Sequence, residues 1–222
     1  MPPDSCSENA MNRLDQYLEW AEQVHGHLCP GQILGVRMAL YALELLGIEA
    51  PHGKDRKRLI TFVEIDRCLS DAIMLVTGCR LGKRALKFRD FGKPAATFWD
   101  LQTGRAVRLL ALESAKDRAR ELYPDICDPR QQQSLAYRHL PNQELFQVQW
   151  VRVQLPAEDL PGYRGAKVIC ARCGEPISFR REVWVQDGPV CRACAGEAYY
   201  QVEAIGDGPQ GHASGPSEDH QP

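Results

Sequence analysis

Hydrophobic residues follow a helical spacing in some parts of the chain and a strand spacing in others. Apolar side chains recur every three to four residues over residues 9–24 and 32–46, which predicts two amphipathic helices. Shorter runs rich in β-branched and aromatic residues predict strands at 59–65, 86–91, 96–101, 106–112 and 146–155. Further helices are predicted at 70–76, 115–123 and 131–139. This order predicts an α+β fold with a mixed or antiparallel sheet and packed helices.

Three boundaries divide the chain after the last predicted strand. Residues 1–155 form the predicted α+β domain, and residues 156–165, rich in Pro and Gly, form a linker. Residues 166–205 form a separate cysteine-rich module with a predicted hairpin over 179–190, turning at 187–189, and a helix over 195–202. Residues 206–222 are too polar to bury a core, so we expect a disordered tail there. The linker is long enough for the module to exchange between the protomers of a dimer.

Composition narrows the class of protein. The chain has 222 residues, of which 44% are hydrophobic and 25% charged, enough to bury an ordinary core. A net charge of −2 gives no reason to expect nucleic acid as a partner. No signal peptide or membrane span is predicted, so we expect a cytoplasmic protein without membrane contact. In that reducing compartment the nine cysteines are expected to be metal ligands or redox thiols, not structural disulfides.

The C-terminal cysteines form two knuckles, Cys170-x-x-Cys173 and Cys191-x-x-Cys194. Four thiolates at this spacing predict a closed tetrahedral Zn²⁺ site of the structural kind. Because so small a module buries little apolar surface, metal binding is expected to supply folding free energy on the order of 10 kcal/mol. The arrangement resembles a treble-clef or zinc-ribbon module, for which we expect a protein partner.

A second group of potential ligands lies near the N-terminus. His25, His27 and Cys29 fall within five residues, and Cys29 lies near the start of the helix predicted at 32–46. The positive end of that helix and the nearby imidazoles favour a thiolate, which suits a metal ligand and a nucleophile equally. We favour His27 over His25 as a ligand because the hinge at Gly26 leaves the second imidazole beside Cys29.

Two more cysteines flank the predicted helix at 70–76. At 1.5 Å per residue, Cys68 and Cys79 are about 15 Å apart, so each needs partners from elsewhere in the fold. Cys79 is compatible with simple packing as well as with a functional role. Asp66 and Asp71 suit helix N-terminal caps as well as catalysis. A site with three or fewer protein ligands would leave a position open for substrate or water.

Four motifs in fixed order resemble the FmdE family of formylmethanofuran dehydrogenase proteins. They are the segment from His25 to Gly31 and residues 64–72, 77–83 and 90–93. The resemblance implies a dimeric α+β core with a metal or redox site made by His25, His27, Cys29, Cys68 and Cys79. Cys29, His27 and Cys68 are its catalytic candidates. The resemblance further implies that the protein is an accessory or redox component associated with the subunits of a molybdenum- or tungsten-dependent dehydrogenase.

The sequence leaves the identity of the second metal and the function of the chain open. His/Cys sites accept zinc, nickel, iron and copper, so the sequence does not identify the second metal. One alternative is a non-catalytic metal-binding or adaptor protein whose zinc module docks a partner. Another is a zinc-finger regulator that contacts nucleic acid, which the charge balance disfavours.

Overall fold

The computed structural model describes residues 10–203 and 205. It divides into two compact units, Met1–Gly162 and Tyr163–Pro222, which we call the core domain and the C-terminal module. The core domain combines helices with a mixed sheet, so the predicted α+β class is confirmed. The predicted tail at 206–222 lies outside the described residues.

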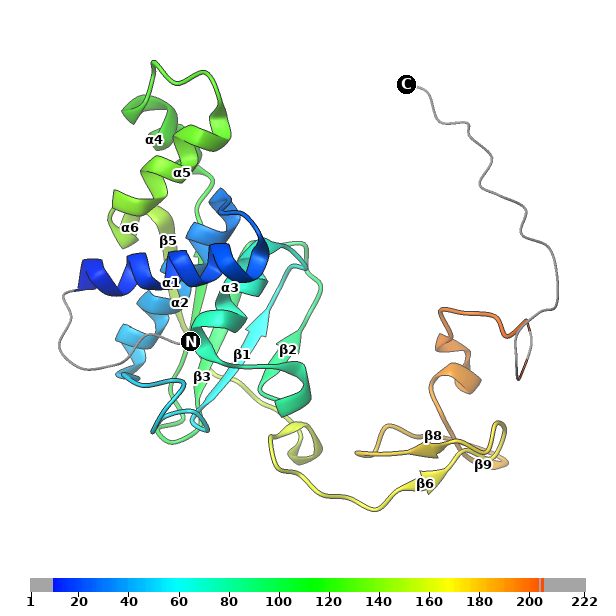
Figure 1. Ribbon diagram of the computed structural model, residues 1–222. Helices are drawn as coiled ribbons and strands as arrows, with labels where there is room; N and C mark the ends of the chain where they lie inside the picture. Colours follow the sequence, from blue (N-terminus) through cyan, green and yellow to red (C-terminus); the bar gives the residue numbers. More distant parts are fainter. Residues whose placement is uncertain (1–9, 204, 206–222) are drawn as a thin grey trace, which may run out of the picture. The chain divides into compact units, whose positions relative to one another are not determined.

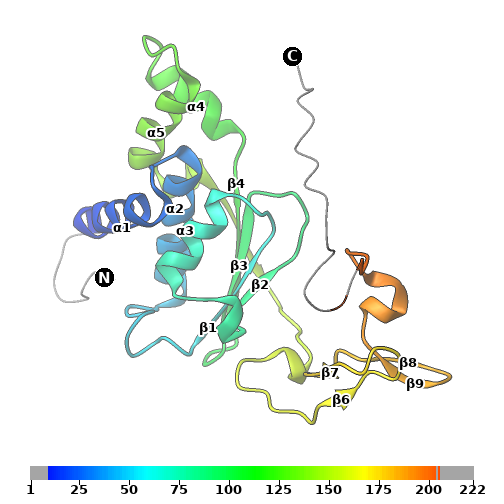
Figure 2. The same cartoon turned by 45° about the vertical axis from the view of Figure 1, so that its right-hand side comes forward.

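The core domain is built on a five-stranded sheet with the order β2-β1-β3-β4-β5. Its strands are β1 (Leu59–Val63), β2 (Leu86–Phe88), β3 (Ala95–Asp100), β4 (Ala106–Ala111) and β5 (Phe146–Val151). Only β1 and β2 are parallel, and the other neighbours are antiparallel. Its helices are α1 (Ala10–His25), α2 (Pro30–Leu46), α3 (Cys68–Thr77), α4 (Ser114–Leu122), α5 (Pro129–His139) and α6 (Asn142–Leu145). Figures 1 and 2 show α1, α2 and α3 on one face of the sheet.

The two faces of the sheet differ in chemistry. The register pairs Phe98 with Val107, and both side chains are fully buried in the main core with the helices. On the other face Arg108 donates from Nε and Nη2 to both carboxylate oxygens of Glu64, each at 2.7 Å, and from Nη1 to Gln149 Oε1. Such a two-pronged pair satisfies a largely buried carboxylate, since Glu64 is only 5% exposed. Glu64 therefore stabilises the sheet.

Helices α2 and α3 approach each other unusually closely. A Cβ atom placed on Gly35 would lie 2.4 Å from the carbonyl oxygen of Leu69 and 2.8 Å from Ala72 Cβ. One turn earlier, a Cβ on Gly31 would lie 3.3 Å from Cys68 Cβ. The missing side chains let the two backbones pack almost in contact. This packing brings the N-terminal ends of α2 and α3 together.

Several predicted boundaries in the core domain were wrong. The strand predicted at 86–91 ends at Phe88, because the amides of Phe91 and Lys93 both bond to the carbonyl of Glu64 in a turn through Gly92. The strand predicted at 146–155 ends at Val151. The chain then crosses to the opposite edge of the sheet and forms a short 3-10 turn at Ala157–Asp159. There Lys87 Nζ, on the edge strand β2, donates to the carbonyl of Asp159. Helix α6 was not predicted, because four residues are too few for a periodic pattern.

The C-terminal module consists of two short hairpins and one turn of helix. The hairpins pair β6 (Val168–Ile169) with β7 (Pro176–Ile177) and β8 (Val183–Val185) with β9 (Gly188–Val190). The predicted hairpin began too early, because Phe179 and Arg180 both have positive φ and form a turn. The helix predicted at 195–202 is wrong: one helical turn covers Ala193–Glu197, and Gly196 with φ 109° interrupts it.

The close contact of α2 with α3 leads to a stability prediction. Gly35→Ala should lower the free energy of unfolding of the core domain by about 2 kcal/mol, because its new methyl group meets backbone that cannot move aside. The control is Gly53→Ala, whose Cβ would lie 3.5 Å from Ala50 Cβ in ordinary contact and should cost little. Urea unfolding followed by the helical circular dichroism signal measures both. Equal stability of wild type and Gly35→Ala would contradict the packing described here.

Candidate metal centre

His25, His27 and Cys29 come together where α1 ends and α2 begins. Helix α1 ends at His25, and Gly26 follows in the left-handed region with φ 86°, its amide bonded to the carbonyl of Glu22. This turn folds the chain back within two residues. The potential ligand atoms of His25, His27 and Cys29 then lie within 4.8 Å of one another. The two imidazole rings are 4.8 Å apart between centroids.

Cys29 is the N-cap residue of α2. Its backbone is extended, Pro30 occupies the first helical position, and the Cys29 side chain makes no capping hydrogen bond. Its carbonyl instead accepts the first helical bond, from the amide of Ile33 at 3.1 Å. The Cys29 sulfur therefore lies at the positive end of the helix dipole without being used as a helix cap.

Cys68 adds a second thiol from the start of α3. It lies against Cys29, because a Cβ on Gly31 would lie 3.3 Å from Cys68 Cβ and 3.7 Å from Cys29 Sγ. Gln32, almost fully buried, donates from Nε2 to the carbonyl of Cys68 at 3.1 Å and joins the two helix ends. Burial, and then the neighbouring Cys29 side chain, raise the pKa of the Cys68 thiol. Two adjacent thiols cannot both ionise easily without a cation.

Asp71 extends the group on its other side. Its Oδ2 lies 3.9 Å from His25 Nδ1, while its side chain stays 59% exposed. The N-cap residue of α3 is Arg67, and Asp71 sits inside the first turn, so the capping role considered for Asp66 and Asp71 is not what the structure shows. The spacing from Cys68 to Asp71 places both residues on one helix face, which could have indicated this arrangement.

Cys79 lies apart from the cluster. It follows the far end of α3, is only 3% exposed, and accepts a hydrogen bond from Thr61 Oγ1 at 3.4 Å while donating to the carbonyl of Leu59 at 3.5 Å. Burial raises the pKa of the Cys79 thiol. These contacts are those of a neutral buried thiol packed against β1. The structure thus brings together four of the five residues predicted for this site.

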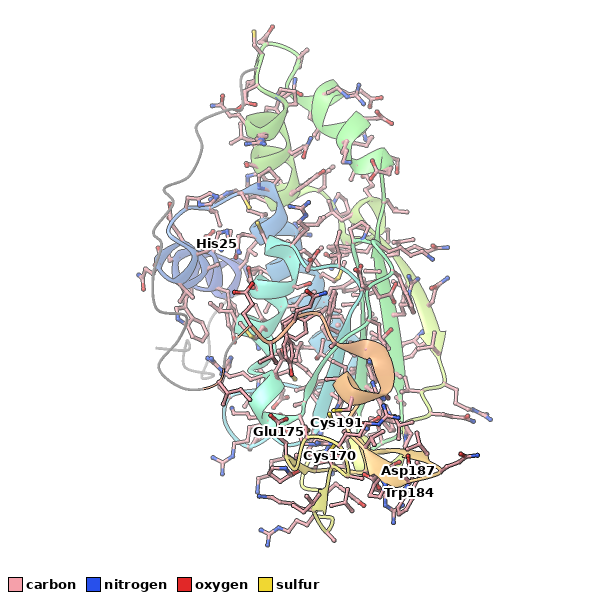
Figure 3. The ribbon with its side chains drawn as sticks, turned by 90° about the vertical axis from the view of Figure 1, so that its right-hand side faces the viewer. His25, Cys170, Glu175, Trp184, Asp187 and Cys191 are labelled. Atoms are coloured by element: carbon pink, nitrogen blue, oxygen red, sulfur yellow. The ribbon has the colours of Figure 1, made fainter. Side chains whose placement is uncertain are left out.

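The four C-terminal cysteines converge on one point. All four sulfur atoms lie within 4.8 Å of one another, and Cys173 Sγ and Cys191 Sγ are 3.9 Å apart. Zn–S bonds of about 2.3 Å in a tetrahedron place sulfurs about 3.8 Å apart, so the arrangement fits Zn²⁺. Figure 3 shows the labelled Cys170 and Cys191 close together.

Backbone hydrogen bonds in the module position the cysteine side chains and change their pKa values. The carbonyl of Cys170 accepts from the amide of Gly174 at 3.0 Å, which closes the first knuckle, and Cys170 Sγ accepts from the amide of Cys191 at 3.3 Å. Backbone N–H groups, that of Cys173 first, lower the pKa of Cys170 to about 6. Hydrogen bonding from Cys191, burial and the other thiols raise the pKa of Cys194 to about 12. A divalent cation would remove this conflict by neutralising the shared charge.

Two known families match the chain, one in the core domain and one in the C-terminal module. Residues 24–155 match the family described as "FmdE, Molybdenum formylmethanofuran dehydrogenase operon", and residues 163–200 match "Prokaryotic dksA/traR C4-type zinc finger". Together with the cluster of four sulfurs, the second match indicates structural zinc. Within the described residues, no helix is both long and apolar enough to span a bilayer.

Two individual proteins are similar to the chain. A protein of Archaeoglobus fulgidus named "Probable S-adenosyl-L-methionine-binding protein" is 32% identical over 220 residues, which is 89% of this chain and 57% of the relative. The chain therefore spans little more than half of that relative. A solved structure of a tungsten formylmethanofuran dehydrogenase FmdE-like protein from Syntrophus aciditrophicus has a TM-score of 0.58 and 20% identity. The match covers 90% of this chain and 100% of that protein. At this identity the likeness shows the fold alone.

The cluster of four sulfurs leads to a prediction about zinc. Cys194→Ser should lower bound zinc by about one ion per chain, because three thiolates and a hydroxyl hold Zn²⁺ far more weakly than four thiolates. Cys127→Ser, at an exposed cysteine outside both ligand clusters, is the control and should retain the wild-type zinc content. Elemental analysis of purified protein measures both variants. Unchanged zinc in Cys194→Ser would show that the metal is held elsewhere.

Proposed function

Because this chain belongs to the FmdE family, we propose that it is a metal-binding accessory or redox component of a molybdenum- or tungsten-dependent dehydrogenase of the formylmethanofuran type. One observation carries the proposal: the gathering of His25, His27 and Cys29, with Cys68 alongside, at the facing ends of three helices. Two imidazoles and a thiol within 4.8 Å form a typical donor set for a transition metal.

The donor set fits an open metal site. Three ligand atoms on one side leave at least one coordination position, unlike the four sulfurs of the C-terminal module. Cys68 is close enough to Cys29 to serve as a fourth ligand or as a separate redox thiol. A metal bound here would supply a Lewis-acidic or redox-active centre. Zinc, nickel, iron and copper all suit mixed imidazole and thiolate ligands.

The chain's own residues would prepare this centre in distinct ways. Cys29 offers a sulfur ligand at the N-cap position of α2, where it makes no capping hydrogen bond. Asp71, next to His25 Nδ1, would orient the imidazole and favour one tautomer, as carboxylates behind ligating histidines commonly do. His27 is exposed and would be the ligand nearest to solvent.

A second candidate function is that of an adaptor whose C-terminal module docks a protein. Large side chains are exposed on the module: Ile169 at 60%, Trp184 at 70% and Tyr199 at 96%. Aromatic residues are enriched at protein interfaces. A nucleic-acid role is less well supported, since Arg172 donates to the carbonyl of Cys194 and Arg192 lies 3.8 Å from Glu197.

The name of the archaeal relative suggests S-adenosyl-L-methionine as a ligand, but the cavity beside the His/Cys cluster does not favour it. The chain covers only 57% of that relative. The cavity beside His25 has a volume of about 290 Å³, at the lower end of the usual range for small-molecule sites. A ligand much smaller than a nucleoside sulfonium fits it better.

The proposed metal site predicts a definite metal stoichiometry. Wild-type protein purified without added metal should hold about two metal ions per chain, and Cys29→Ser about one, because the core-domain site loses its thiolate. Cys127→Ser should again hold two. Elemental analysis gives both the number and the identity of the metals. One ion in wild type and in Cys29→Ser alike would refute the core-domain site and leave thiol chemistry to explain the cluster.

The carboxylate behind His25 predicts a change in affinity. Asp71→Asn should weaken metal binding at the core-domain site by about tenfold, because it removes the charge that orients and polarises the imidazole. Asp66→Asn, at an exposed residue just before α3, is the matched control and should bind as wild type does. Competition with a chelator measures the affinity. Equal affinities in Asp71→Asn and Asp66→Asn would exclude this role for Asp71.

A further inference from the structure

A cavity of about 290 Å³ lies between α1 and α3, next to the proposed metal site. Trp20, Ala21, Val24 and His25 line it from α1, Asp71, Met74 and Leu75 from α3, and Gln32 and Arg80 complete it. His25 and Asp71 belong to the ligand cluster, and neither the fold nor the metal site accounts for the rest of the cavity. It therefore offers space for a molecule that approaches the cluster.

The walls of the cavity are apolar and preformed. Trp20 is held between two aromatic neighbours, with ring centroids 6.1 Å from Tyr17 and 5.4 Å from His52. His52 is fixed in turn by a hydrogen bond to the carbonyl of Val76 at 3.0 Å. A wall whose side chains are already ordered loses little entropy when a ligand binds. An apolar ligand body would thus find a rigid surface between Trp20 and Met74.

Side chains of opposite charge line the cavity. Arg80, an exposed residue three positions beyond α3, is the only arginine or lysine in the lining, and within the described part of the chain it forms no ion pair. Asp71 also lines the cavity, beside His25. From Asp71 to the end of α3 at Thr77 the helix rises about 9 Å, which separates the backbone positions of Asp71 and Arg80 along the helix axis. One anionic group is attracted to Arg80, and a second near Asp71 would be repelled by it.

From these contacts we propose that the cavity binds a small monocarboxylate with an apolar tail. The carboxylate pairs with the guanidinium of Arg80, which matches it with two parallel hydrogen bonds. The tail lies along Trp20 and Met74 and ends beside His25. This proposal deepens the proposed function by naming a ligand class for the space next to the metal site. It rests on the proposed function only in treating that space as adjacent to a bound metal.

The probe ligands are hexanoate and its neutral counterpart hexanamide, which have the same tail. In calorimetric titration of the full chain, hexanoate should bind at least about tenfold more tightly than hexanamide, since a charge-assisted pair is stronger than a neutral hydrogen bond. The indole N–H resonance of Trp20, assigned by its loss in Trp20→Phe, should shift as hexanoate binds. Equal affinities of the two probes, or an unmoved Trp20 resonance, would overturn the proposal.

Two arginine variants locate the carboxylate. Arg80→Gln should abolish the preference for hexanoate while keeping the affinity for hexanamide, because the apolar walls are unchanged. Arg89→Gln, at an exposed arginine outside the cavity, should keep the full preference. Retained preference in Arg80→Gln would overturn the proposal, since the charge would then bind elsewhere.

The metal site and the cavity can fail independently. Cys29 is not part of the cavity lining, so Cys29→Ser should bind hexanoate as wild type does, even when it has lost the core-domain metal. Hexanoate binding in a wild type that holds zinc only in the C-terminal module would support the cavity and refute the metal site. Two metal ions per chain together with an unmoved Trp20 resonance would support the metal site and refute binding in the cavity.

Discussion

The near contact between α2 and α3 is the constraint on which the core domain depends. With no side chain at Gly35, the carbonyl of Leu69 approaches to a distance that any other residue would forbid. One turn earlier, the missing side chain of Gly31 allows a similarly close approach of Cys68. As a result two helix N-terminal ends lie side by side, each with a cysteine at its first or capping position. The paired thiols follow from helix packing, and the turn at Gly26 then adds two imidazoles.

The two clusters of potential metal ligands are supported by buried cores of very different size. In the core domain the potential ligands are placed by a large buried core of helices and sheet. In the C-terminal module only Cys170, Ile177 and Val190 are buried among the described residues, and the four sulfurs occupy the place of a core. So small a core with four converging sulfurs is typical of a module in which structural zinc supplies folding free energy. In the core domain the same physics permits an open site, because the fold does not need every coordination position filled.

Sequence patterns predicted these features unequally. The periodicity over residues 9–24 and 32–46 identified α1 and α2 to within two residues, because long amphipathic helices give a strong signal. The knuckle spacing identified the four C-terminal cysteines that converge, since Cys-x-x-Cys fixes a local turn. Boundaries failed where tertiary contacts decide them, as at Phe88, where the chain turns to bond the carbonyl of Glu64. The helix predicted at 195–202 failed because Gly196 adopts a positive φ that ends the turn.

The N-terminal cluster shows the limit of sequence reasoning most clearly. The first motif brings its own three ligands together, so local spacing was sufficient for His25, His27 and Cys29. The choice between Cys68 and Cys79 depended on which end of α3 faces the start of α2, and no local pattern contains that information. Arg80 lies within the motif at 77–83, but no motif places it beside Trp20, because a cavity is made by the packing of separate elements.

The central claim is that helix packing in the core domain creates a metal site distinct from the zinc site of the C-terminal module. Anomalous X-ray diffraction from crystals of the full chain, recorded on both sides of the absorption edge of each metal present, tests it most directly. We expect one peak among the four C-terminal sulfurs and a second in contact with His25, His27 and Cys29, with Cys68 beside it. A peak in the C-terminal module alone, or a second metal held by other residues, would contradict the account.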